Sequence, residues 1–312
     1  MKSNSYSKFF RNVLLLLVIV FVIDFAIGSV LRHFYFKQSS GMQYRTTYSM
    51  EETKADVLIF GSSRASHHYV PDVFESKLNM TYFNVGQDGN YIFYHYALLK
   101  TILKRYKPKV IILDILNREF DPTEREAYER IAALLPYYKT HPEIRPIVEL
   151  KGFSEKLKLL SSIYPFNSSM LTIAIGNTEM NKQRKPNMKG YLPRYKKLTE
   201  VGKWEVPPAY VIDTVKLNAF VSFAKDCKDA GVPLYVVYSP TLVPEGFKDL
   251  SLRKAKEVTA LFGAKFLDFG TDTAFNFKPA LFADAIHMND DGARIMSAMV
   301  ADSIMNNLSL KK

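Results

Sequence analysis

Hydrophobic residues along this chain fall into five short runs, which alternate with segments of helical spacing. The short runs predict β-strands, over residues 55–61, 81–86, 108–115, 232–240 and 264–270. Apolar positions at helical spacing, with a glycine end or an Asn-Asp start, predict helices, over residues 91–106, 211–231, 252–263 and 289–308. This alternation predicts an α/β class, with a three-layer α/β/α arrangement around a mostly parallel five-stranded sheet.

A different apolar pattern stands near the N-terminus, from Val13 to Leu31, where the run is apolar on every face and holds one charge, Asp24. At about 1.5 Å per helical residue, its length matches a hydrocarbon core of about 30 Å. A cleaved signal peptide normally has a shorter apolar region and a small-residue cleavage site, which we do not find here. We therefore predict a single-pass, uncleaved transmembrane helix. Basic residues flank both ends, so charge does not set its orientation. An acid within a membrane segment is by default a functional hint.

Two segments lack a clear period. Residues 32–54 are polar and aromatic, and residues 119–208 carry scattered prolines and a basic patch. The predicted organisation is therefore a basic segment over 1–12, an anchor over 13–31, a juxtamembrane linker over 32–54, and a domain over 55–308 with an insertion at about 119–208.

The formal net charge of +11 favours anionic surroundings, such as phospholipid, an acidic glycan or nucleic acid, without choosing among them. Nucleic acid is the weaker choice, because the anchor places the domain poorly for it and no binding motif appears. The single cysteine, Cys227, allows neither an internal disulfide nor a cysteine-based zinc site. No nucleotide-binding motif is present either, and we expect no cofactor and no metal.

Candidate chemistry gathers at the carboxyl ends of the strands, where ligands bind in such sheets. Ser62 and Ser63 follow the first strand, and Asp284 precedes His287 by three residues just before the last helix. A carboxylate so placed can accept the proton on one ring nitrogen and leave the other nitrogen as a base. That base would activate a serine hydroxyl, and the N–H groups of a tight turn would stabilise the oxyanion.

This set of motifs resembles the SGNH/GDSL hydrolase superfamily, whose fold is flavodoxin-like. Gly61-Ser62-Ser63 matches its first block, "NVGQDGN" its second through Gly86, and the Asp-x-x-His its last. The resemblance implies that Ser63 is the nucleophile and that the N–H groups of Ser63 and Gly86 are oxyanion donors. The usual Gly-x-Asn-Asp block is absent, and "DILNREF" offers only Asn117 as a third donor.

A "GSSR" motif behind an N-terminal anchor is similar to a membrane-tethered branch of that superfamily. This branch includes the teichoic-acid D-alanyl transfer protein DltD and envelope polysaccharide acetyltransferase-like proteins. The resemblance implies a serine esterase or O-acyltransferase at the cell envelope, with the domain outside the cytoplasm. Its expected partners are an acylated envelope polysaccharide or lipid and a membrane acyltransferase. The alternative is an inactive protein of this fold that only binds a glycan or such a partner, which the missing block favours.

Other polar residues near the first strand have two interpretations each. Arg64 either binds a substrate anion beside Ser63 or pairs with an acid at the edge of the sheet. His67 and His68 are adjacent, which favours surface or helix-packing roles, and His95 on an aromatic-rich helix favours the core. Residues 181–203 hold eight Lys or Arg, which indicates either a solvated loop or a platform for anionic headgroups or polymers.

Overall fold

The computed structural model describes residues 3–178, 188–201, 208–244 and 249–309. Its centre is a parallel five-stranded sheet in the order β2-β1-β3-β4-β5, with strands Val57–Phe60 (β1), Tyr82–Asn84 (β2), Val110–Asp114 (β3), Leu234–Tyr238 (β4) and Lys265–Asp268 (β5). This is the strand order of a flavodoxin-like doubly wound sheet. The predicted fold class and all five strands are confirmed.

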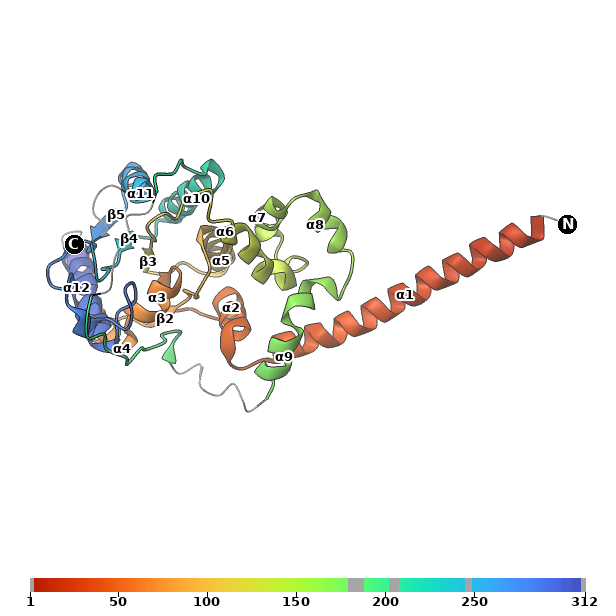
Figure 1. The fold of residues 1–312 in the computed structure, drawn as a ribbon, viewed down its shortest axis with the longest axis horizontal. Helices are drawn as coiled ribbons and strands as arrows, with labels where there is room; N and C mark the ends of the chain where they lie inside the picture. The colour runs from red at the N-terminus through yellow and green to blue at the C-terminus, as the bar shows by residue number, and fades with distance from the viewer. Residues whose placement is uncertain (1–2, 179–187, 202–207, 245–248, 310–312) are drawn as a thin grey trace.

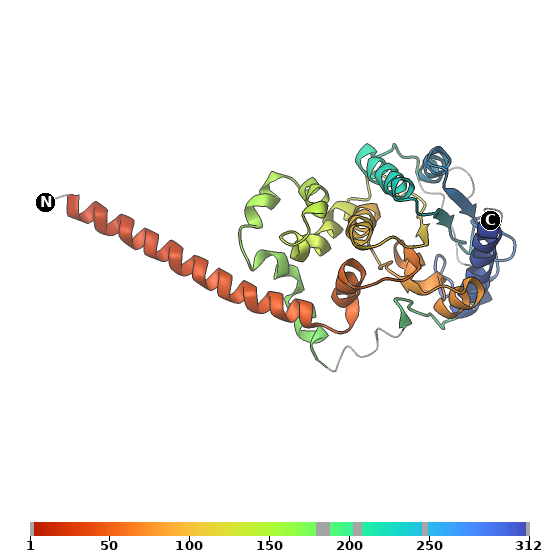
Figure 2. The same ribbon diagram turned by 180° about the vertical axis from the view of Figure 1, so that it is seen from behind.

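Helices cover both faces of the sheet (Figures 1 and 2). One core cluster joins one face to α5 (Ile92–Arg105), α10 (Thr214–Ala230) and α11 (Leu250–Leu261). The other cluster joins the opposite face to α3 (Ser63–His68), α4 (Pro71–Leu78) and α12 (Asp290–Ser309). Alternate residues of each strand enter opposite clusters, for example Leu58 and Ile59 of β1, as the two-residue period of a strand requires.

The predicted linker over 32–54 contains a helix, α2 (Gly41–Glu51), that packs against α5. Its buried side chains are mostly polar, which explains why no apolar period marks it. Thr46 lies within 3.1 Å of the Gln87 side chain, and the Arg45 guanidinium donates to the carbonyl of Gly86. Helix α2 therefore supports the loop that follows β2.

The predicted insertion forms short helices between the sheet and the N-terminal helix (Figure 1). They are α6 (Glu126–Glu129), η1 (Arg130–Tyr137), η2 (Pro142–Ile144), α7 (Arg145–Val148), η3 (Glu149–Lys151), α8 (Phe153–Lys158), η4 (Tyr164–Ser169) and α9 (Met170–Gly176). Several of their side chains, including Tyr137 and Phe166, belong to the same core cluster as α5. Much of the basic segment over 181–203 lies outside the described residues.

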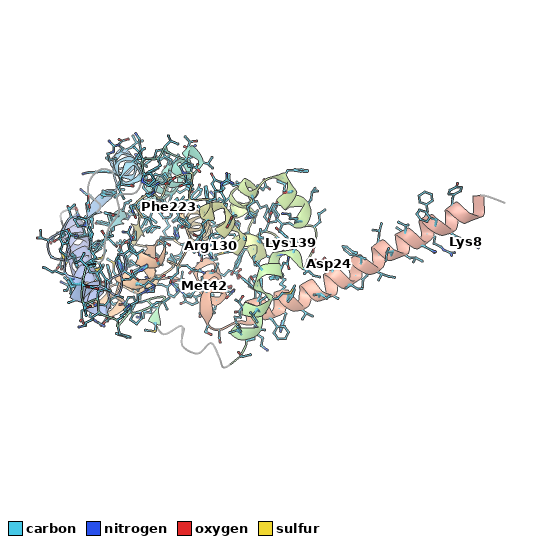
Figure 3. All side chains as sticks on the ribbon, viewed as in Figure 1. Lys8, Asp24, Met42, Arg130, Lys139 and Phe223 are labelled. Atoms are coloured by element: carbon cyan, nitrogen blue, oxygen red, sulfur yellow. The ribbon has the colours of Figure 1, made fainter. Side chains whose placement is uncertain are left out.

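One helix, α1 (Ser3–Lys37), contains the whole predicted anchor. By length and composition, its segment Tyr6–Lys37 can cross a membrane, a property that signal sequences share. Its first part projects away from the globular part, and Figure 3 shows Asp24 where the two meet. Near its C-terminal end, Tyr35 is buried against the rings of Tyr137 and Phe166. The far end of α1 is thus part of the core.

His95 makes folding stability depend on pH. Its burial in α5 lowers the pKa of His95 to about 3, whereas an unfolded chain takes up this proton below about pH 6.5. The unfolded state then binds more protons, so the free energy of unfolding falls as the pH falls. Between about pH 7 and about pH 4.5, we expect His95 to remove about 3 kcal/mol. Denaturant titration at both pH values measures the free energy of unfolding of the wild type and of His95→Gln. The difference between the two proteins should change by about 3 kcal/mol from one pH to the other. An unchanged difference would contradict this prediction.

Candidate active site

Ser63 stands at the first position of α3, directly after the end of β1. The chain can turn there because Gly61 has a φ of +137° and because a Cβ on it would lie 2.7 Å from the carbonyl of Asp114. Ser62 is 4% exposed, whereas Ser63 is half-buried. The turn therefore presents Ser63, and not Ser62, at the carboxyl end of the sheet.

His287 joins Ser63 to Asp284. The Nε2 atom of His287 lies 2.7 Å from the hydroxyl of Ser63, and its Nδ1 atom lies 2.9 Å from both carboxylate oxygens of Asp284. The Asp284 carboxylate also accepts the N–H groups of Ile286 and His287 at 3.0 and 2.9 Å. The structure thus brings the three predicted catalytic residues into one continuous chain of hydrogen bonds.

Asp284 remains ionised in this arrangement. Burial alone would raise the pKa of Asp284, but the hydrogen bond and charge of His287, with the two backbone N–H groups, hold it well below its usual range. A carboxylate fixes the imidazole with its proton on Nδ1 and stabilises the imidazolium that forms when Nε2 takes a proton. His287 is therefore positioned as a base toward Ser63.

Arg194, from the insertion, completes the surroundings of Asp284. Its Nη1 atom donates to the Asp284 carboxylate at 2.9 Å, and its Nη2 atom lies 3.1 Å from Nε2 of His67. The backbone of the same segment is tied to the domain, because Leu192 donates to the carbonyl of Ser66 at 2.8 Å. No local motif marks Arg194 in the sequence, because its link to Asp284 joins distant parts of the chain.

His67 lies beside the catalytic histidine. Its ring is 5.4 Å from that of His287, at nearly a right angle, and its Nε2 atom lies 3.2 Å from the carboxylate of Asp88. His67 follows Ser63 by four residues, so the two share one side of α3. That spacing is the sequence signal that could have placed His67 in the site rather than on the surface.

The backbone of the loop after β2 differs from what the predicted oxyanion donors require. The N–H of Gly86 faces the carbonyl of Ile59 at 3.0 Å and the side-chain oxygen of Asn84 at 2.9 Å, so it is already engaged. This geometry contradicts Gly86 as a donor. Gly89 lies in the same loop at a φ of +71°, and its N–H has no partner among the described residues. Asn117 is half-buried after β3, and its part in an oxyanion site stays a prediction.

Arg64 lies buried beneath the turn, which favours its pairing with an acid over the predicted substrate-binding role. It is 1% exposed, its Nε atom lies 3.3 Å from the carboxylate of Asp114, and its guanidinium stacks on the ring of Tyr238. Further bonds run to the carbonyls of Ser239 and Ile115. The alternative interpretation, pairing with an acid of the sheet, is confirmed. Arg64 anchors the turn from beneath.

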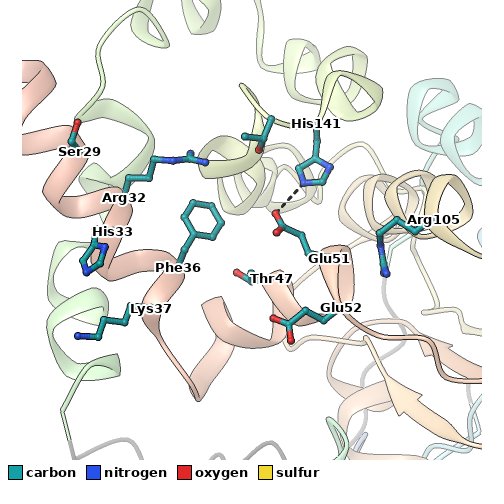
Figure 4. A pocket seen from close by; sticks show the side chains of 11 residues that line it. Ser29, Arg32, His33, Phe36, Lys37, Thr47, Glu51, Glu52, Arg105 and His141 are labelled. Carbon is teal, nitrogen blue, oxygen red and sulfur yellow. Dashed lines mark hydrogen bonds and ion pairs between the residues drawn. The ribbon is translucent and has the colours of Figure 1, made fainter.

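Within the residues that the structure describes, no group of three or more His, Cys, Asp or Glu side chains is arranged to hold a metal ion. A cavity of about 950 Å³ lies between α1, α2 and the insertion (Figure 4). It is lined by residues such as Arg32, Glu51 and His141, and none of its lining residues belongs to the Ser63 site.

Removing Arg194 is expected to slow any reaction in which His287 acts as a base toward Ser63. Without its bond to Asp284, the carboxylate loses one of the contacts that fix its orientation toward His287. We expect Arg194→Ala to lower kcat about 10-fold, the size of one lost charged hydrogen bond, with little change in KM. The matched control is Arg294→Ala, which removes an arginine paired with Asp72 and Asp290 on the surface. Equal kcat values for the two variants would show that Arg194 does not position Asp284.

No family model matches this chain, and no curated protein matches it. Among solved structures, it is similar to a candidate acylhydrolase from Bacteroides fragilis, with 13% identity and a TM-score of 0.43 over 85% of this chain and 96% of that chain. A candidate SGNH hydrolase from Slackia heliotrinireducens has 13% identity and a TM-score of 0.42, over 80% and 97% of the two chains. An acetyl xylan esterase has 11% identity and a TM-score of 0.39, over 80% and 98%. At such identities and TM-scores, the function of this chain must be inferred from its own residues.

Proposed function

We propose that this chain is a serine enzyme that cleaves esters through an acyl-enzyme on Ser63. The observation that carries the proposal is the unbroken hydrogen-bonded chain from the Ser63 hydroxyl through His287 to Asp284. Nucleophile and base lie within hydrogen-bond reach, and the base is oriented by a third group, which is the arrangement that activates a serine. A protein that only bound its ligand would not need this geometry.

In the first step, Nε2 of His287 takes the Ser63 proton while the hydroxyl oxygen attacks the ester carbonyl. The N–H groups of Ser63 and Gly89 would stabilise the oxyanion. The intermediate collapses, the alcohol leaves with the proton from His287, and the acyl group stays on Ser63. In the second step, His287 takes a proton from the acceptor, whose oxygen attacks the acyl-enzyme. The bond to Ser63 then breaks as His287 returns the proton to the Ser63 oxygen. Water as acceptor gives hydrolysis, and a sugar hydroxyl gives O-acyl transfer.

A second cavity lies beside the loop that carries Gly89, and its lining residues do not include Ser63, Asp284 or His287. It has a volume of about 450 Å³ and is lined by Gln87 and Asn90 of this loop, by Met42 of α2 and by Arg130 of the insertion. Its size is in the range of small-molecule sites.

Helix α1 supports a membrane-bound form of this enzyme. Its apolar part is exposed, while its far end is packed into the core through Tyr35. We propose that α1 is a retained single-pass anchor, that the domain lies outside the cytoplasm, and that the ester belongs to an envelope polysaccharide or lipid. A membrane acyltransferase is the proposed source of acyl groups for the transfer reaction.

A covalent serine probe tests the proposed nucleophile directly. Full-length protein is treated with a fluorophosphonate, and mass spectrometry locates the adduct. We expect the adduct on Ser63, no adduct in Ser63→Ala, and strongly reduced labelling in His287→Ala. Ser76→Ala, on the outer side of α4, is the control that should label normally. Folded protein without an adduct, or with an adduct on another serine, would overturn the assignment.

A further inference from the structure

Two short helices of the insertion expose large apolar side chains to solvent. Phe153, the first residue of α8, is 74% exposed. Leu160, two positions after the end of α8, is 75% exposed, and Leu171 of α9 is 73% exposed. They are joined by further exposed residues, namely Leu150, Leu157, Met170 and Ile175. We call this set the insertion patch. Monomeric soluble proteins rarely gather such side chains in one region without a binding partner.

The insertion patch lies where α1 leaves the globular part. Helix α9 and the preceding η4 pack on α1, and the Asn177 side chain donates to the carbonyl of Phe34 at 2.8 Å. Helix α8 lies at the same end of the molecule in both views (Figures 1 and 2). The exposed apolar side chains therefore come from elements beside the exit of the proposed anchor.

Asp24 fixes the position of α1 relative to the insertion. Its carboxylate accepts the N–H of Ser162 and the hydroxyl of Ser161, both at 2.5 Å. One turn further on, a Cβ on Gly28 would lie 2.4 Å from the backbone of Ser162, so only a glycine permits this approach. The segment that contains the insertion patch can thus neither slide along α1 nor swing away from it without breaking these contacts.

The length of the free part of α1 then sets the depth of the patch. The predicted anchor over residues 13–31 gives about 28 Å at about 1.5 Å per residue, against a hydrocarbon core of about 30 Å. Beyond Asp24, the outer side of the helix still exposes Phe25 and Val30, at 59% and 55%. A bilayer that covers this apolar length reaches the level of Asp24, and with it the insertion patch.

We propose that the insertion patch is a second membrane-contact surface, in which Phe153, Leu157, Leu160 and Leu171 enter the interfacial region of the bilayer around α1. The proposal rests on the anchor proposed above and goes beyond it. Lys156 and Lys158 flank these side chains on α8 with about half of each side chain exposed, and they pair with Glu149 and Glu155 at 2.8 and 3.5 Å. Their apolar stems can lie along the interface while their charges meet lipid phosphates. A lipid surface fits better than a single partner helix, because the apolar residues lie on separate elements around the anchor.

Spin labels on full-length protein in vesicles of phosphatidylcholine and phosphatidylglycerol test this surface. The label is placed at Leu160→Cys in the patch, at Leu17→Cys in α1, or at Leu261→Cys at the end of α11. Leu261 is 71% exposed, which matches Leu160, and it ends helix α11, which lies at the opposite end of the globular part from α1 (Figure 1). The native Cys227 is buried, and treated wild-type protein corrects for any label there. The readout is collision of the label with oxygen, which partitions into lipid, and with a water-soluble nickel chelate.

We expect the oxygen-to-nickel ratio at Leu160 to exceed that at Leu261 several-fold and to approach that at Leu17. A low ratio at Leu160 with a high ratio at Leu17 would overturn the second contact surface and leave the anchor in place. Low ratios at both positions would overturn the anchor and the surface together. The vesicles contain no other protein, so a high ratio at Leu160 identifies lipid as the occupant. Catalysis does not enter this readout, so the result is independent of the Ser63 proposal.

Discussion

Replacing Ser63 by alanine is expected to lower kcat for ester cleavage by about 10⁴-fold or more, the usual cost of removing a serine nucleophile. Without its hydroxyl, no acyl-enzyme can form, and His287 has no proton to take at 2.7 Å. The side chain is half-buried and small, so the fold should tolerate the change. Hydrolysis of a chromogenic acetyl ester by full-length protein in detergent measures the effect.

Two further variants separate a lost nucleophile from lost binding. Asp284→Asn should also lower kcat strongly, because an amide cannot stabilise the imidazolium at His287. Ser63→Ala combined with Asp284→Asn should be little worse than Ser63→Ala alone, because the residues act as one unit. Multiplying effects, or substantial turnover in Ser63→Ala, would show that the reaction proceeds at another site.

Replacing Asp114 by alanine is expected to lower the free energy of unfolding by about 3–5 kcal/mol, because it leaves a buried charge without its partner. Asp114 and Arg64 are both almost fully buried, and the Asp114 carboxylate also accepts the hydroxyl of Tyr69 at 2.7 Å. Denaturant titration followed by circular dichroism measures the loss. Activity should fall as well, since Arg64 directly follows Ser63 in the chain.

An exposed pair provides the matched control. Asp229 pairs with Lys225 on the surface of α10, and Asp229→Ala should cost about 0–1 kcal/mol. The double variant Arg64→Met, Asp114→Leu should regain much of the loss, because it removes both buried charges instead of one. Were Asp114→Ala as mild as Asp229→Ala, the buried pair would not hold the turn.

The strands and long helices could be predicted because each buries an apolar face that leaves a period in the sequence. Helix α2 could not, since Arg45 and Thr46 are buried through hydrogen bonds rather than apolar contact. For Arg64 the sequence allowed either a substrate contact or pairing with an acid, and only the tertiary contact with Asp114 distinguishes the two. A polar residue is buried in the core when a hydrogen-bond or charge partner lies beside it. Those partners are far away in the sequence, so a single sequence does not reveal them.

The candidate site divides in the same way. Ser63, Asp284 and His287 belong to short local motifs, so their spacing was enough to predict them, and the structure brings them together. Arg194 reaches Asp284 from the insertion, which carries no motif. In the loop after β2, Gly86 and Gly89 look alike in sequence, and only backbone direction shows which N–H is engaged.

The burial of Tyr35 also has a consequence for the proposed membrane-bound enzyme. Because the end of α1 and all of α2 pack into the core, a protease that cut between them would remove part of the fold rather than release a working catalyst. In the proposed anchored form, the enzyme would therefore diffuse only within the plane of the membrane. Its active site could then lie no further from the membrane surface than the thickness of one domain. For the proposed envelope polysaccharide, only esters close to the membrane surface would then be within reach of the proposed anchored form, and more distant esters would not be modified.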